Sequence, residues 1–431
     1  MDKKSFEEFY VKYGEKRYPI ETTKSIQKCH ITYEQKDQAV KDATVFRKLA
    51  KQDAIHDMQD FFHCLKRCYS GYDYFFTEEA CENLQNSVIS KIKGWPGKIT
   101  NRRLCSILHK ALYEMLNDCH FELYVCGRTR FFQRRYIAYV TELVLRKVEE
   151  KYEVIKGTKA VPKGHLFSET EVQEFLMPTL YTCENSSMDN AYYLLGKYSS
   201  KRVTAFSVGG KKLKTHRILS DFAKQVDGER LIHKEGYVVA NHVTYGMPWK
   251  EDLLEEYEKE GCTCAKENAV ILNLLGNEGG CSGYPERFYK GLCGTGENWY
   301  VGAYLSSPGD IQDEIKRYSY DYPNPKVQPS YEGTVYVVMN KATASSAEMG
   351  ISPSYHLKNA VRVGSASFGC GTFGNCVLFQ LPHSKIVFRF GHRLFYHEGF
   401  EEGKGFLPDF WIDDKNPVAV VEQYIKEKRQ V

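Results

Sequence analysis

The chain has 431 residues, of which 42% are hydrophobic and 14% aromatic. This composition is typical of an ordered globular protein, and the length predicts two or three domains at about 100 to 200 residues each. The 59 basic and 55 acidic side chains leave a formal charge of only +4, which does not indicate a nucleic-acid-binding protein.

The N-terminus, "MDKKSFEEFYVKYGEKRYPIE", is charged and lacks the apolar stretch of a secretory signal. Apolar runs such as "AVILNLL" fall far short of the roughly 20 residues that a membrane-spanning helix needs. The 14 cysteines do not repeat a zinc-site spacing, which favours free thiols in a reducing compartment. We therefore expect a cytoplasmic protein without a metal site.

Helical periodicity dominates the first part of the chain, where apolar residues recur every three or four positions in "AIHDMQDFFHCLKRCY" and "NRRLCSILHKALYEMLNDCH". Strand-like segments such as "FELYVC" and "YIAYVTELVL" follow, separated by Gly and Ser turns. These patterns predict a helical N-terminal domain over residues 1–120 and a β-rich middle region over 121–230, in which no PDZ-like module is evident.

Strands alternate with helices from about residue 230 onward. "EGYVVANHV", "AVILNLLGNEGG", "TVYVVMN" and "AVRVGSASFG" have strand character, and the charged helix "WKEDLLEEYEKEG" lies between the first two. This alternation predicts an α/β domain over residues 231–431 with largely parallel strands. Catalytic groups in such folds gather at strand ends.

The stretch "VYVVMNKATASSAEMG" places Ser345 and Ser346 where an apolar strand meets a helix. A serine there can cap the helix by accepting a hydrogen bond from the first turn. It can also be a nucleophile, because nearby backbone N–H groups can stabilise an oxyanion. These residues alone leave both interpretations open.

Four separated motifs occur in order: "LNDCH" at 116–120, "VILNLLGNEGG" at 270–280, "TASSAE" at 343–348 and "EGKGFLPD" at 402–409. Together they resemble the S41 serine peptidases, the family of C-terminal processing proteases, tricorn protease and the chlamydial protease-like factor. The resemblance implies a ClpP/crotonase-like α/β core. It also implies a serine endopeptidase that hydrolyses peptides or unfolded protein segments through an acyl-enzyme, without a cofactor. Apart from the resemblance, a homodimer is one possible assembly, which the sequence leaves open.

The same resemblance implies a catalytic triad. The family's nucleophile precedes a helix-start glutamate by three residues, which selects Ser345 with Glu348 as the marker. One branch uses a lysine as base, but Cys370 stands at that place in "FGCG". The branch with a Ser-His-Glu triad matches His120 in "NDCH" and Glu402 in "EGKGFLPD". In that triad, the imidazole accepts the hydroxyl proton and the carboxylate orients the ring.

The "GNEGG" turn would supply the oxyanion hole, since glycines let backbone N–H groups approach a reacting carbonyl. By resemblance, Gly279 and Gly280 line this hole together with the N–H of Ser346. The chain departs from the family in the preceding strand, where Asn273 and Leu275 replace an aspartate and an arginine.

Three alternatives stay open. His242 in "VVANHVTY" is a rival base, and Cys370 a rival thiol nucleophile. A catalytically inactive S41-like peptide- or ligand-binding protein is the rival function, favoured by the missing lysine and arginine and opposed by the retained Ser, His and Glu.

Pro353 is expected to end or kink the helix that follows Ser345. The missing PDZ-like module argues against the substrate selection of the tail-specific branch.

Overall fold

A computed structural model describes residues 4, 6–8, 12, 17–18, 23–180, 192–225, 228–246, 250–294, 301–304, 315–316, 319–321 and 329–429. The chain divides into two compact units, each built from separated segments. The first unit comprises Met1–Arg134, Tyr300–Pro323 and Cys370–Glu398, and the second comprises Arg135–Trp299, Asn324–Gly369 and Gly399–Val431. Most of the charged N-terminal stretch, on which the expectation of a cytoplasmic location rests, lies outside the described residues.

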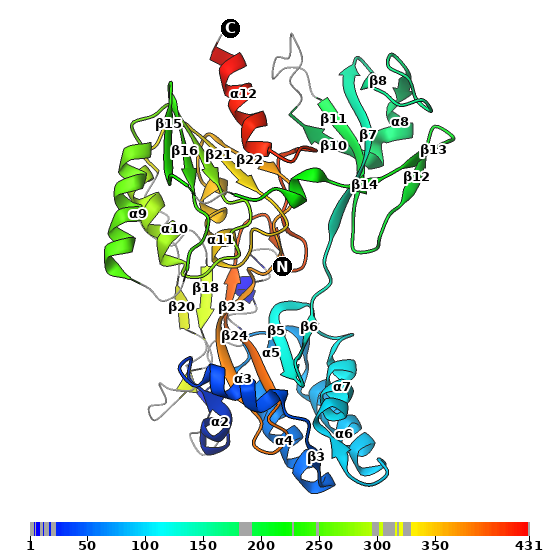
Figure 1. Ribbon diagram of the computed structural model, residues 1–431, viewed down its shortest axis with the longest axis vertical. Helices are drawn as coiled ribbons and strands as arrows, with labels where there is room; N and C mark the ends of the chain where they lie inside the picture. Colours follow the sequence, from blue (N-terminus) through cyan, green and yellow to red (C-terminus); the bar gives the residue numbers. More distant parts are fainter. Residues whose placement is uncertain are drawn as a thin grey trace. The chain divides into compact units, whose positions relative to one another are not determined.

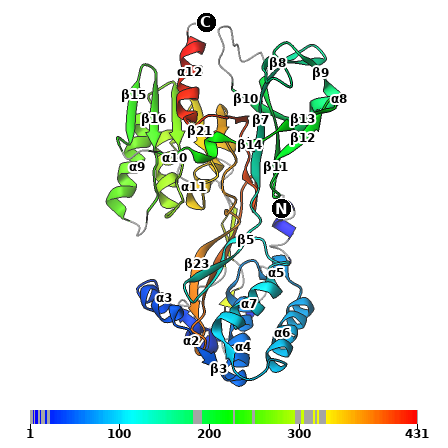
Figure 2. The same cartoon turned by 45° about the vertical axis from the view of Figure 1, so that its right-hand side comes forward.

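Helices supply most of the first unit's N-terminal part, as the periodicity predicts. They are α2 (Thr23–Cys29), α3 (Lys36–Thr44), α4 (Lys51–Cys68), α5 (Tyr72–Phe75), α6 (Glu78–Lys93) and α7 (Asn101–Leu112). Thr77 and Thr100 cap α6 and α7, because each side-chain oxygen accepts a backbone N–H of the first turn. Helices α4, α6 and α7 pack together (Figure 2), and the short strands β3 (Lys48–Leu49) and β4 (Ile99–Thr100) pair beside them.

The first unit's sheet joins residues from three parts of the sequence. Its strands are β2 (His30–Ile31), β5 (Asp118–Val125), β6 (Arg128–Phe132), β18 (Val301–Tyr304), β20 (Ser319–Asp321), β23 (Phe373–Gln380) and β24 (Val387–Tyr396); β1 (Arg17–Tyr18) and β19 (Ile315–Lys316) form a separate pair. Strand β24 pairs antiparallel with β5, so that Phe388 lies opposite Leu123. Both side chains are fully buried in one apolar core with Phe61 of α4.

This pairing explains why β23 and β24 join the N-terminal helices instead of the α/β region in which the sequence places them. The apolar face of β24 is buried against β5, more than 250 residues earlier in the chain, and burial of that face outweighs proximity in sequence. The expected domain boundaries at 120 and 230 stay a prediction.

The second unit is built on a long mixed sheet. In spatial order its strands are β15 (Leu231–Lys234), β16 (Tyr237–Asn241), β17 (Ala269–Asn273), β21 (Thr334–Met339), β22 (Ala360–Gly364), β27 (Phe410–Trp411), β10 (Leu176–Thr179), β11 (Tyr192–Ser199), β7 (Ile137–Val148), β8 (Lys151–Lys156) and β9 (Leu166–Ser168), with β14 (His216–Arg217) beside β7. Strands β16, β17, β21, β22 and β27 run parallel, which confirms the predicted parallel α/β region. Two hairpins lie outside this sheet, β12 (Ala205–Val208) with β13 (Lys211–Lys214) and β25 (Phe400–Glu401) with β26 (Gly405–Phe406).

Helices cover both faces of the parallel part. Helices α9 (Glu251–Cys264) and α10 (Gly283–Cys293) pack side by side (Figure 1) and share one apolar core with α11 (Ser346–Met349). Helix α12 (Pro417–Arg429) contributes to a second core. Strand β17 alternates between the two, because Val270 and Leu272 belong to the first and Ile271 to the second. The two cores therefore mark opposite faces of the sheet.

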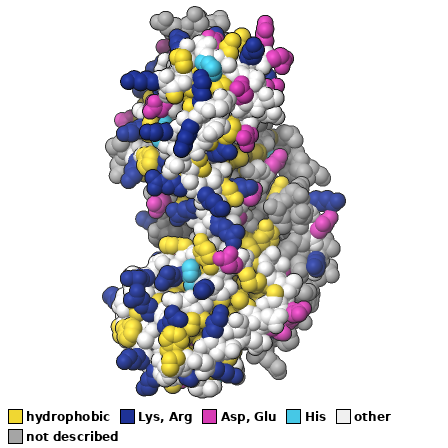
Figure 3. Space-filling view, turned by 90° about the vertical axis from the view of Figure 1, so that its right-hand side faces the viewer, with side chains coloured by type: hydrophobic (Ala, Val, Ile, Leu, Met, Phe, Trp, Pro, Cys, Tyr) yellow, Lys and Arg dark blue, Asp and Glu magenta, His cyan; other side chains and the backbone are white. Residues whose placement is uncertain are grey.

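The β-rich part of the second unit carries many basic side chains. Exposed lysines occur along β7, β8 and β13, at positions 147, 151, 156, 212 and 214; Figure 3 shows Lys and Arg side chains in dark blue on the face that it presents. The remaining short helical segments are α8 (Glu169–Val172), η2 (Gln173–Phe175), η3 (Leu219–Phe222) and η4 (Ser352–Tyr355). In the described part of the chain, every helix is too short or too polar to cross a membrane.

Candidate active site

Ser345 lies in the turn between β21 and α11 and has a rare backbone conformation. Its φ is 54° and its ψ is −121°, a region that residues with a side chain seldom adopt. Helix α11 ends at Met349 after four residues, and the 3₁₀ turn η4 then begins at Ser352, just before Pro353. The predicted strand-to-helix junction and its early end are thus confirmed.

Gly279 lies directly against the Ser345 turn. A Cβ atom at Gly279, whose φ is 96°, would stand 2.6 Å from the Ala344 carbonyl oxygen and 2.8 Å from the Ser345 Cβ. A Cβ at Gly280 would stand 2.2 Å from the Tyr245 carbonyl oxygen. Only glycine fits at either position. At Gly279 this brings the "GNEGG" turn against Ser345, and at Gly280 against Tyr245.

The backbone N–H groups of this turn differ in their partners. The Gly279 N–H donates to Asn277 Oδ1 at 2.9 Å, and the Ser346 hydroxyl donates to the Gly280 carbonyl at 2.8 Å. Within the described ranges, the N–H groups of Gly280 and Ser346 donate no hydrogen bond. Of the three expected oxyanion donors, these two are therefore available, whereas the Gly279 N–H is engaged.

Glu348 holds the Ser345 turn through hydrogen bonds. Its side chain is fully buried, and it accepts hydrogen bonds from the Ser345 N–H at 3.1 Å, the Ser367 hydroxyl at 2.5 Å and the Gly369 N–H at 2.7 Å. Sequence reasoning used Glu348 only to mark the nucleophile. The signal for its structural role was the serine three residues earlier, which is the spacing of a capping box.

Glu402 lies in the turn between β25 and β26, within the same unit. The next residue, Gly403, donates its N–H to the Gly369 carbonyl at 2.8 Å. Since Gly369 also donates to Glu348, one hydrogen-bonded path joins the Ser345 turn to the Glu402 turn.

Lys341 is a buried cation that sequence reasoning missed. Only 7% of its surface is exposed, and its ammonium group donates to the carbonyl oxygens of Ser367 at 2.6 Å and Lys404 at 2.9 Å, and to the Tyr198 hydroxyl at 3.1 Å. It ties the end of β21 to the segments that carry Gly369 and Glu402. A lone charge within the apolar and small residues of "VVMNKATASS" was the available signal.

His120 belongs to the first unit, on β5, within a bulge between Asp118 and Glu122. The backbone N–H of His120 donates to Asp118 Oδ1 at 2.7 Å, and the Tyr69 hydroxyl donates to Asp118 Oδ2 at 2.8 Å. Burial raises the pKa of Asp118 to about 7. Burial also lowers the pKa of His120, with a smaller contribution from the positive charge of Arg389, to about 4. Because Ser345 and Glu402 belong to the second unit, the triad with His120 stays a prediction.

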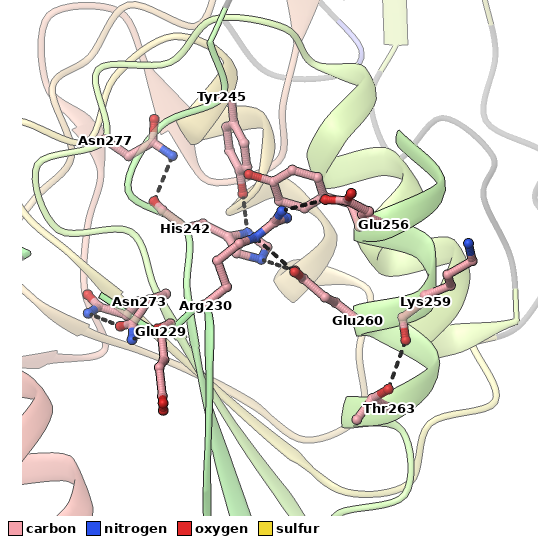
Figure 4. Close-up of polar contacts among 12 residues, drawn as sticks. Glu229, Arg230, His242, Tyr245, Glu256, Lys259, Glu260, Thr263, Asn273 and Asn277 are labelled. Atoms are coloured by element: carbon pink, nitrogen blue, oxygen red, sulfur yellow. Dashed lines mark hydrogen bonds and ion pairs between the residues drawn. The ribbon is translucent and has the colours of Figure 1, made fainter. Parts of the chain in front are cut away.

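His242, the rival base, is buried in the core beneath α9 and α10 (Figure 4). Its Nδ1 lies 2.7 Å from the Tyr245 hydroxyl, and its Nε2 lies 3.8 Å from Glu260 Oε2. Burial lowers the pKa of His242 to about 3, and the charge of Arg230, which is paired with Glu260 at 2.8 Å, adds to this. Nδ1 thus has Tyr245 as its partner, whereas Nε2 is buried toward Glu260 without a hydrogen bond to any described residue. This burial favours a structural role for a neutral imidazole.

Neutral amides support the loop in which the family has a charged pair. The Asn273 amide donates to Asn241 Oδ1 at 2.9 Å, and its own Oδ1 accepts the Leu275 N–H at 3.3 Å. Leu275 packs into the core under α12.

Cys370, the rival nucleophile, is 4% exposed and belongs to the first unit. No group of three His, Cys, Asp or Glu side chains suited to a metal occurs among the described residues.

Comparisons with known proteins find neither a matching family model nor a curated relative. Solved structures of S41-type peptidases are similar at low identity. Mature CPAF complexed with lactacystin is 12% identical, with a TM-score of 0.46 over 88% of this chain and 97% of that one. The photosystem II D1 C-terminal processing protease is 11% identical, with a TM-score of 0.39 over 84% and 93%. The tricorn protease is 11% identical, with a TM-score of 0.33 over 88% of this chain and 37% of its own.

Proposed function

We propose that this protein is a serine endopeptidase of the S41 type, which hydrolyses peptide bonds in peptides or unfolded protein segments through an acyl-enzyme on Ser345. The observation that carries the proposal is the Ser345 backbone at φ 54°. A serine that merely caps a helix has an extended backbone. A positive φ costs about 1 to 3 kcal/mol and persists only where the surroundings enforce it, which is typical of functional sites.

The surroundings enforce it here from two sides. Gly279 packs against the Ser345 Cβ, and Glu348 holds the Ser345 N–H. The Gly280 and Ser346 N–H groups have no other acceptor among the described residues, so they supply two donors for an oxyanion.

The proposed reaction is acyl transfer in two steps. The Ser345 hydroxyl oxygen attacks the scissile carbonyl, its proton passes to the base, and the carbonyl oxygen becomes an oxyanion held by the two N–H groups. The tetrahedral intermediate expels the amine, which takes the proton from the base. Water then attacks the ester in the same way and releases the acid.

His120 is the proposed base and Glu402 its orienting acid, by resemblance to the triad branch of the family. The proposal also includes a ClpP/crotonase-like arrangement of the parallel core. It requires His120 to reach Ser345 when substrate is bound, at a hydrogen-bond distance of roughly 2.6 to 3.2 Å.

A second candidate is an S41-like protein that binds peptides without cleaving them. It is favoured by the Gly279 N–H, which donates to Asn277 instead of pointing to a free site, and by Cys370 in place of the dyad lysine. The two candidates differ in whether Ser345 reacts.

Treatment with a fluorophosphonate probe followed by peptide mapping tests this directly. We expect an adduct on Ser345 that is lost in Ser345→Ala and kept in Ser346→Ala and Cys370→Ala. Labelling and peptide cleavage should fail in His120→Ala, fall in Glu402→Gln and persist in any folded His242→Ala protein. Folded wild-type protein that neither labels nor cleaves a peptide library would favour the binding protein, and a dead His242→Ala with an active His120→Ala would reject the assigned base.

A further inference from the structure

A polar cavity of about 420 Å³ lies in the second unit beside the start of α12. Strands β15, β16 and β17 form one wall, and Lys415 and Asn416 contribute from the other side. Lys224, Gln225 and Lys234 complete its polar lining. The volume is sufficient for a small metabolite.

The charges around this cavity are unbalanced. Lys224, Lys234 and Lys415 line it; all three are exposed, and they form no ion pair with an acid of the described ranges. The one acid in the lining is Glu422, which accepts a hydrogen bond from the Tyr237 hydroxyl at 3.1 Å. Three cations against one anion leave two positive charges, which is the complement of a phosphate monoester at neutral pH.

A buried acceptor in the lining adds a second requirement. The Gln225 amide nitrogen donates to the Asn273 carbonyl at 2.6 Å, whereas its Oε1 is buried without a hydrogen-bond partner. Such an atom destabilises the protein while it stays unsatisfied. A ligand hydroxyl can donate to it once the amide turns toward the cavity, so the lining suits a molecule that carries both a phosphate and a hydroxyl group.

We propose that this cavity binds a small phosphorylated metabolite bearing a hydroxyl group, with the phosphate among Lys224, Lys234 and Lys415 and the hydroxyl at Gln225. The site is separate from the Ser345 turn. Its lining residues Val239 and Leu275 belong to the core under α12, whereas Ala347, which follows Ser346 in α11, belongs to the core on the opposite face of the sheet.

A path of hydrogen bonds leads from the cavity to the glycine turn. The Gln225 amide nitrogen lies 3.3 Å from the His242 carbonyl oxygen, to which the Asn277 amide also donates at 2.9 Å. Asn277 in turn accepts the Gly279 N–H. A bound ligand that engages Gln225 would therefore alter the hydrogen bond between Asn277 and the Gly279 N–H. This consequence rests on the proposed peptidase function. It is measured as the rate of probe labelling at Ser345.

Binding is measured without reference to activity, by calorimetric titration of the full chain with glycerol 2-phosphate and with inorganic phosphate, at constant ionic strength. We expect saturable one-to-one binding of both, tighter for glycerol 2-phosphate. The Lys234→Met/Lys415→Met variant should bind at least about tenfold more weakly, because each charge-assisted hydrogen bond contributes about 1.5 to 3 kcal/mol. Lys266→Met, an exposed lysine on the α9 side that also lacks an acidic partner, should bind as the wild type does.

Gln225→Leu serves as a second variant, which should remove the preference for glycerol 2-phosphate over inorganic phosphate. Equal affinity in wild type and Lys234→Met/Lys415→Met, or no saturable heat with either probe, would overturn the site. Since these outcomes do not depend on Ser345, they reject the metabolite site alone. Failure of probe labelling with intact phosphate binding would reject the peptidase alone.

Discussion

The buried Glu348 carboxylate accepts the backbone N–H of Ser345 at 3.1 Å and, through its other oxygen, the Gly369 N–H at 2.7 Å. One side chain therefore couples the strained turn of the candidate nucleophile to the segment against which the Glu402 turn packs. Because the Glu348 side chain is fully buried, its hydrogen bonds cannot be exchanged for water without cost.

Replacing Glu348 with glutamine tests this coupling. The amide keeps one acceptor but turns an NH₂ group toward backbone or hydroxyl donors, so we expect Glu348→Gln to destabilise the protein by about 1 to 3 kcal/mol and to slow labelling of Ser345. Thermal melts and probe kinetics measure the two effects. The control is Glu255→Gln, whose exposed pair with Lys259 at 3.7 Å should change stability by less than about 0.5 kcal/mol. Equal melting temperatures for Glu348→Gln and Glu255→Gln would contradict a structural role of Glu348 in the Ser345 turn.

The Gly279→Ala variant tests whether Gly279 is needed for its close approach to the Ser345 turn, in addition to its positive φ. Gly279 and Gly276 both have positive φ, at 96° and 72°, but only Gly279 has atoms within 3 Å of the Cβ position. Both substitutions should cost about 1 kcal/mol for the backbone. Gly279→Ala should cost more, because the new methyl group meets the Ala344 carbonyl and Ser345, and it should abolish probe labelling. The measurements are the melting temperatures and adduct yields of Gly279→Ala and Gly276→Ala. Comparable labelling of the two variants would mean that the glycine turn can move away from Ser345.

Lys341→Met removes a buried cation and leaves the carbonyl groups of Ser367 and Lys404 without that donor. We expect a loss of about 2 to 5 kcal/mol, since breaking a buried charged contact on one side strands its partners. The measurement is urea unfolding. Lys358→Met, which breaks an exposed pair with Glu332 at 3.4 Å, provides the baseline and should stay within about 1 kcal/mol of wild type. A loss of stability no larger than that of Lys358→Met would show that the contacts of Lys341 with Ser367 and Lys404 do not stabilise the protein.

The buried histidines make stability fall as the pH is lowered. His242 has a pKa of about 3 in the folded protein, against about 6.5 when unfolded. The unfolded chain binds more protons between these values, so stability is complete above pH 6.5 and is lost as the pH drops toward 3. At pH 5, His242 alone accounts for about 2 kcal/mol of this loss.

Urea unfolding at pH 7 and pH 5 measures this slope. His242→Gln should flatten it, and His56→Gln should leave it unchanged because His56 is exposed. An unaltered slope in His242→Gln would show that this imidazole titrates normally.

The reaction itself should have a lower pH midpoint than an ordinary histidine would give. Since burial and Arg389 lower the pKa of His120 to about 4, a base at His120 stays neutral to well below pH 6. We expect labelling of Ser345 to rise with pH around 4 and to be flat from 6 to 8. Arg389→Gln should move the midpoint upward, because it removes a positive charge that opposes protonation. A wild-type midpoint near 6 to 7 would mean that the base is elsewhere or that substrate changes its surroundings.

Local patterns in the sequence determined the elements of this protein. The runs "AVILN" and "TVYVVM" indicated buried parallel strands, and Pro353 indicated the early end of the helix after Ser345; the structure bears out all three. The four motifs also indicated the candidate catalytic and oxyanion-hole residues, because each motif is contiguous in the chain.

Tertiary structure decided the contacts between those elements. That β24 pairs with β5, that both nitrogens of His242 face Tyr245 and Glu260, and that Lys341 reaches Ser367 and Lys404 all depend on segments far apart in sequence. Periodicity records which face of an element is apolar, but not which distant face it will meet. The φ of Ser345 has the same origin, because the packing of Gly279 and the hydrogen bond to Glu348 help to hold a conformation that the local sequence would not adopt alone.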